Sequence, residues 1–171
     1  MRLKIESATE CLIGKGLWGF SRAANLAVFQ IGNRQTLPSQ KGGTRVVGEF
    51  ALHVDCAWNI TREDRVVMAR RDLYYPAGHE DPRQSIPEEF DWERDPNRLD
   101  ELSRALFQDG AREYRVKRIG VGAAGSLSME LSDGYRLEVL PDNSSSYEFW
   151  RLFKHGDRER HFVVTNRGIE T

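Results

Sequence analysis

Hydrophobic and polar residues alternate most regularly between residues 48 and 60 of the chain. The apolar positions of this segment are Phe50, Leu52, Val54, Cys56, Trp58 and Ile60. The positions between them are Glu49, Ala51, His53, Asp55, Ala57 and Asn59. Successive side chains of a strand point to opposite faces, so the alternation predicts one long strand with an apolar face and a mixed polar face. We therefore expect a β-sheet with a core on one side.

Shorter apolar segments on both sides of this strand predict further strands. They cover residues 11–20, 23–32, 65–76, 112–122, 126–132, 135–141, 147–153 and 161–165. In the third of these segments we expect Val67 and Ala69 to face inward and Pro76 to end the strand, because proline has no N–H to donate. Residues 1–10 are expected to be weakly ordered, and residues 33–45 to form a polar surface loop.

Residues 95–108 are predicted to form the main helix. Asp95 is expected to cap its N-terminus, Pro96 suits the first helical position, and Gly110 suits the stop. The apolar face of the helix consists of Leu99, Leu102, Ala105 and Leu106. Residues 77–94 carry many charges and two prolines, which predicts an irregular connection.

The short turns between the predicted strands favour antiparallel neighbours. We expect an α+β, mainly β fold: an antiparallel sandwich or partly closed barrel of about nine or ten strands with one main helix. Residues 1–171 are expected to form a single domain. A weak likeness links AANLAVFQIG with AAGSLSMELSDG, CAWNI with EFWRLF, and RVVMA with HFVVT, in the same order in each half. It raises the alternative of two related β-meanders, residues 11–76 and 115–168, joined by a loop and the helix.

Length and charge narrow the class of protein. A chain of 171 residues buries enough surface to fold without disulfides, so Cys11 and Cys56 are expected to be reduced and buried. The 25 basic and 26 acidic residues are spread along the chain, which argues against a nucleic-acid or membrane partner. The N-terminus lacks the apolar core of a signal peptide, so a cytoplasmic location is expected.

Two groups of residues are candidates for chemistry. His53 and Asp55 lie two positions apart on the polar face of the long strand, and Glu49 lies on the same face, so a histidine–carboxylate acid–base pair is one hypothesis. Arg70, Arg71 and Tyr74 form a basic and aromatic group that could anchor an anionic ligand. No metal-ligand spacing is present, and the glycine-rich segments at residues 14–19 and 120–125 are followed by strands, so we expect neither a metal site nor a cofactor.

The segments GEFALHVDCAW, RRDLYYP, SDGYRLEVLP and WRLF, with the final HFVVT, resemble a family of small bacterial proteins known as conserved hypothetical sequences. The likeness extends from about Cys11 to Gly168. It implies a bacterial cytoplasmic protein, and because no activity is established for that family, it implies no functional residues.

These observations favour a non-catalytic binding or adaptor protein of the immunity or regulatory kind, with a protein as its partner. The alternative is a small-molecule-binding barrel or a hydrolase-like enzyme with its site on the polar face of residues 48–60. The pattern does not specify an oligomeric state.

Overall fold

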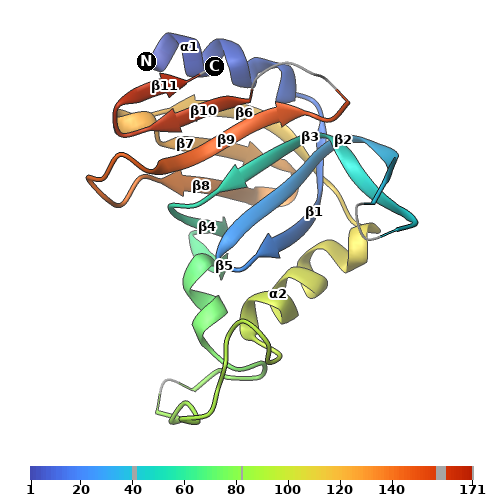
Figure 1. Ribbon diagram of the computed structural model, residues 1–171, viewed down its shortest axis with the longest axis vertical. Coiled ribbons are helices and arrows are strands. Elements are labelled where there is room, and N and C mark those ends of the chain that lie inside the picture. The colour runs from blue at the N-terminus through green and yellow to red at the C-terminus, as the bar shows by residue number, and fades with distance from the viewer. Residues whose placement is uncertain (40–41, 82, 157–160, 171) are drawn as a thin grey trace.

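The computed structural model describes residues 1–39, 42–81, 83–156 and 161–170 of the chain. The strands of this part are β1 (Gly16–Ala23), β2 (Leu26–Pro38), β3 (Thr44–Val54), β4 (Ala57–Arg62), β5 (Arg65–Ala69), β6 (Tyr114–Val121), β7 (Leu127–Leu131), β8 (Tyr135–Leu140), β9 (Glu148–Lys154), β10 (Phe162–Thr165) and β11 (Gly168–Glu170) (Figure 1). Its helices are α1 (Arg2–Thr9) and α2 (Arg98–Phe107), with short 3-10 helices η1 (Glu10–Leu12), η2 (Arg70–Tyr74), η3 (Gln108–Gly110), η4 (Ala123–Gly125) and η5 (Ser132–Gly134). None of the helices among these residues is long and apolar enough to cross a membrane.

All strands pair antiparallel, in the order β11-β10-β9-β3-β2-β1-β6-β7-β8-β4-β5. The sheet folds over into two layers: a first layer from β11 to β1 and a second layer from β6 to β5. β1 and β6 join the layers through two residue pairs, Gly16 with Arg115 and Leu17 with Tyr114. The end strands β11 and β5 do not pair with each other. The fold is therefore a partly closed antiparallel sandwich, which confirms the predicted class.

The segment of residues 48–60 is buried as predicted, but it is not one strand. The apolar positions from Phe50 to Ile60 are at most 9% exposed. β3 ends at Val54 and β4 begins at Ala57, because the N–H groups of Asp55 and Cys56 both donate to Phe149 O, at 2.9 and 3.2 Å. The chain crosses here from the first layer to the second. The alternation continues across the break because both layers face the same core.

Residues 1–10 are ordered, contrary to the prediction. α1 places Ile5 in the core, and η1 turns Leu12 inward, so that both are 0% exposed. The same turn leaves Cys11 exposed, which corrects the expected burial of that residue, whereas Cys56 is buried as expected. The order of residues 1–10 was not predicted because Ile5 is the only large apolar residue that this segment buries.

The polar segment at residues 33–45 is largely hairpin rather than loop. β2 continues to Pro38 and β3 begins at Thr44, with a bulge between Ile31 and Arg34. The ladder consists of backbone hydrogen bonds, so a solvent-exposed hairpin can form without alternating apolar side chains. In β5, Val67 packs against the core as predicted, but the deeply buried residue is Met68, not Ala69.

α2 begins later than predicted. Its N-cap is Asn97, whose side chain accepts from the N–H of Asp100 at 2.9 Å. Asp95 is not the cap because the chain is still extended at Asn97, where it pairs with Pro76: the N–H of Ala77 donates to Pro96 O, and that of Arg98 to Tyr75 O. On the helix, Leu99 and Phe107 are buried and Leu102 and Leu106 are partly buried, whereas Ala105 is exposed.

Among the described residues, each half begins with a helix and a 3-10 turn, followed by five strands in the first half and six in the second, where β11 has no counterpart. β1–β3 lie in the first layer and β4–β5 in the second, whereas β6–β8 lie in the second layer and β9–β10 in the first. The registers match as well, because Val54 pairs with Trp150 and Val139 with Trp58. The sequence likeness noted above falls on the matched strands β2 and β7, β4 and β9, and β5 and β10. A duplication remains a prediction.

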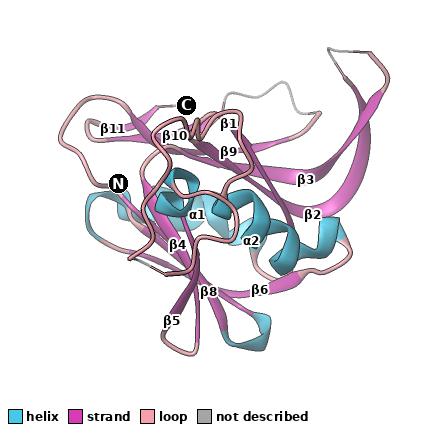
Figure 2. Ribbon diagram, turned by 90° about the horizontal axis from the view of Figure 1, so that it is seen from below, coloured by secondary structure: helices cyan, strands magenta, loops and turns pink. Residues whose placement is uncertain are grey.

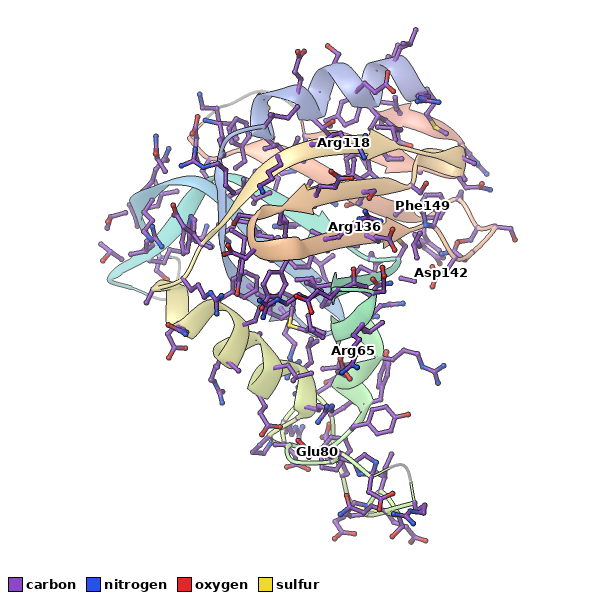
Figure 3. All side chains as sticks on the ribbon, turned by 180° about the vertical axis from the view of Figure 1, so that it is seen from behind. Arg65, Glu80, Arg118, Arg136, Asp142 and Phe149 are labelled. Carbon is purple, nitrogen blue, oxygen red and sulfur yellow. The ribbon has the colours of Figure 1, made fainter. Side chains whose placement is uncertain are left out.

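Figure 1 shows α1 and α2 at opposite ends of the sandwich, and Figure 2 gives the view from below, in which α2 lies in front of the layers. The connection of residues 77–94 extends away from the layers next to the N-terminal end of α2, where Figure 3 shows Glu80 far from Arg118 and Arg136 on the second layer. Its described residues, 77–81 and 83–94, form no helix or strand, as predicted.

The two matched tryptophans provide a test of the core. The indole N–H of Trp150 donates to Gly125 O at 2.8 Å, whereas the buried N–H of Trp58 has no hydrogen-bond partner among the described residues. Trp150→Phe should lower the free energy of unfolding by about 1–2 kcal/mol more than Trp58→Phe, because only the first change leaves a buried carbonyl unpaired. Urea unfolding followed by circular dichroism measures both. Equal losses would contradict the role assigned to this hydrogen bond.

Candidate functional site

The described structure does not place His53 in contact with either carboxylate that was proposed as its partner. Glu49 binds Lys15 at 2.8 Å and lies 3.7 Å from Lys154. Asp55 lies beyond the end of β3, where its carboxylate is 3.8 Å from Arg70. The hypothesis of an acid–base pair was wrong in its geometry because the strand ends before Asp55.

Arg70, Arg71 and Tyr74 all lie in η2, but they do not form one anion site. The guanidinium of Arg70 lies between two carboxylates, 3.8 Å from Asp55 and 3.9 Å from Asp142. Tyr74 packs edge-on against Trp92, with ring centroids 5.4 Å apart, and Arg71 is exposed. Two acidic neighbours leave Arg70 poorly suited to attract an anion.

His53 instead belongs to a cluster around Phe153, which we call the Phe153 cluster: His53, Arg151, Phe153, His155 and His161. Phe153 stacks on His161 with ring centroids 4.1 Å apart, and its ring meets those of His53 and His155 at 4.9 and 5.1 Å. Burial, followed by the charge of Arg151, lowers the pKa of His53 to about 4. Burial also lowers the pKa of His155. His53 is therefore neutral at pH 7.

A cleft lies between α2 and the first hairpin, and we call it the α2 cleft. It consists of two adjoining pockets of about 300 and 550 Å³, which share Phe20, Ser21, Ser103, Arg104 and Asp109. The smaller pocket is also lined by Trp18 and Phe107, which are 7% and 2% exposed, and by Gln30, Val46 and Gly110. Concave sites of this size, with aromatic walls and a few polar groups, are typical of small-ligand binding.

Local contacts fix the walls of the α2 cleft. The indole N–H of Trp18 donates to Gly32 O at 2.9 Å, and the guanidinium of Arg34 lies over the Trp18 ring, 4.4 Å from its centroid. Arg34 also donates to Gly110 O, which links β2 to the turn η3 that follows α2. At the other end, Arg22 and Asp100 form an ion pair at 3.0 Å between β1 and α2. The cleft is therefore held open between two fixed ends.

The α2 cleft lies where the two halves of the chain differ. Trp18 occupies the bulge of β1, whereas Lys117 occupies the corresponding bulge of β6. The β2–β3 hairpin that carries Val46 corresponds to the tight turn η5 between β7 and β8. Two of the cleft walls are thus present in one half only.

Sequence reasoning missed this site. Ser103 and Arg104 lie in the predicted helix, and Trp18 lies in a predicted strand that Ser21 directly follows, but no spacing along the chain indicates that the two segments meet. The sequence contained one signal: the polar segment at residues 33–45 has no counterpart of similar length in the second half of the chain.

No group of three or more His, Cys, Asp or Glu side chains within the described ranges is arranged to hold a metal ion. Among the groups that could ligate one, the three histidines of the Phe153 cluster surround an aromatic ring rather than a common point.

The neutral state of His53 predicts that acid destabilises the fold. Because its folded pKa is depressed, the unfolded chain takes up a proton first, and stability is lost as the pH falls from about 6.5 to about 4. His53→Gln should reduce this loss by on the order of 1 kcal/mol, allowing for solvent screening of a partly exposed group. Urea unfolding at pH 7 and pH 4 measures the difference. An unchanged pH dependence in the variant would disprove this role.

The α2 cleft and the Phe153 cluster are thus two features of the described residues with geometry suited to binding. Comparisons with models of protein families, with curated protein sequences and with solved structures found no match to the chain.

Proposed function

We propose that this protein is a non-catalytic binding protein and that the α2 cleft takes a small polar ligand. The observation that carries the proposal is the cleft itself, a pair of adjoining pockets with aromatic walls and with Ser21, Arg104 and Asp109 on its surface. The fixed walls mean that binding would not require the fold to rearrange, which favours affinity.

The state of the hydroxyl groups supports binding rather than catalysis. The Ser103 hydroxyl donates to Asp100 O within α2 at 3.0 Å, so it is engaged by the helix backbone rather than by a general base. A serine nucleophile needs a base within hydrogen-bond reach. Of the histidines of the Phe153 cluster, His53 lies on β3, His155 directly follows β9 and His161 directly precedes β10, and none of them lines the cleft.

Binding of a protein partner is the second candidate function. The Phe153 cluster favours it, since arginine and aromatic side chains are enriched at protein interfaces and His161 is exposed. A photo-reactive residue at position 161 should form a cross-link to one defined partner in an extract of the native host. Cross-links of equal yield from a position on the second layer, such as 128, would count against this function.

A variant that fills the cleft tests the first proposal. Ser21 is exposed on β1 and lines both pockets, so Ser21→Phe should occlude the cleft without disturbing the core. We expect the wild type to gain thermal stability with one or more compounds of a library of polar metabolites, and the variant to lose that gain.

Ser128→Phe is the matched control, because Ser128 lies on β7 in the second layer and pairs with Gly120. It should retain the response to ligand. A response that survives Ser21→Phe, or the absence of any response in the wild type, would contradict the proposed function.

A further inference from the structure

Two side chains of opposite charge in the α2 cleft lack a partner. Arg104 and Asp109 line both pockets, and neither side chain forms an ion pair or hydrogen bond with another described residue. Arg22 and Asp100, which line the larger pocket, pair with each other at 3.0 Å, whereas Glu93 lines only the larger pocket and forms no ion pair with another described residue. The smaller pocket is therefore lined by one exposed, unpaired cation, Arg104, and one exposed, unpaired anion, Asp109, among the described residues.

The neighbouring polar groups add one donor and one acceptor. The carbonyl oxygen of the Gln30 side chain accepts from the N–H of Gly48 at 2.7 Å, which leaves its amide N–H groups free to donate. Ser103 donates to Asp100 O, which leaves its oxygen free to accept. The cleft thus combines donors, Arg104 and Gln30, with acceptors, Asp109 and Ser103.

This charge pattern discriminates between classes of ligand. A phosphate or a dicarboxylate would be attracted by Arg104 but repelled by Asp109. A diamine would be attracted by Asp109 but repelled by Arg104. A ligand that carries both a carboxylate and an ammonium group satisfies both side chains with charge-assisted hydrogen bonds.

Resting on the proposed function of the cleft, we propose that its ligand is a zwitterion of amino-acid size. Arg104 binds the carboxylate, Asp109 binds the ammonium group, and the side chain of the ligand lies toward Phe20. The smaller pocket, at about 300 Å³, has room for such a molecule.

The probes are the twenty protein amino acids, followed by the N-acetyl and carboxamide derivatives of the one that binds most tightly. Isothermal titration calorimetry should show each derivative binding about tenfold more weakly or worse, because each lacks one of the two charges. Arg104→Gln should abolish the preference for the free acid over the carboxamide. Asp109→Asn should abolish the preference for the free amine over the N-acetyl form.

Both substitutions suit their positions, since glutamine is a good helix former and asparagine tolerates the positive φ of 52° at residue 109. Arg136→Gln and Asp133→Asn are the controls on the second layer, and both should bind as the wild type does. Equal affinity for an amino acid and its two derivatives, with binding still lost in Ser21→Phe, would overturn the zwitterion and leave the proposed function standing. If neither the amino acids nor the polar library binds, both proposals fail.

Discussion

The hydrogen bonds that the N–H groups of Asp55 and Cys56 donate to Phe149 O are the point on which the architecture depends. They end β3 at Val54, and the chain then crosses to the second layer, where β4 pairs with β8. The acceptor belongs to β9, which has itself crossed over to pair with β3. Each half of the chain therefore supplies the strands that complete the layer of the other half.

This exchange explains why one core serves both layers. Trp58 of the second layer contacts Phe29 of the first, with ring centroids 5.1 Å apart. Trp150 of the first layer donates a hydrogen bond to Gly125, in the turn between β6 and β7 of the second layer. The largest aromatic side chains thus hold the layers together at matched positions.

The α2 cleft arises where this internal correspondence fails. The longer β2–β3 hairpin and the tryptophan in the bulge of β1 give the first half a wall and a floor that the second half lacks. Closure of this cleft is opposed by the fixed contacts at its ends, the Arg22–Asp100 pair and the bond from Arg34 to Gly110. The binding geometry is therefore a consequence of unequal halves in an otherwise repeated fold.

The sequence predicted the class of fold and most strands because apolar alternation is a local property, as in residues 48–60. It did not predict the change of layer at Asp55, because inward-facing positions look the same whichever layer they belong to. α1 was missed because Ile5 and Thr9 are its only buried residues, so that no apolar face marks the helix in the sequence.

The candidate site was less predictable than the fold. His53 and Asp55 are close in sequence, yet β3 ends between them, and Asp55 contacts Arg70 instead. The charge of Arg70 is further offset by Asp142, which is distant in sequence. The α2 cleft joins residues about 80 positions apart, Ser21 and Ser103, and only tertiary packing brings them to one surface. Local sequence patterns do not indicate which distant segments pack against each other.

Mapping of amide chemical shifts during titration with the tightest-binding amino acid tests the account most directly. The perturbed amides should cluster around the α2 cleft, at Ser21, Gln30 and residues 103–110, and those of the Phe153 cluster and of Arg70 should stay unchanged. Perturbations centred on His53 and Phe153, or spread evenly over both layers, would contradict it.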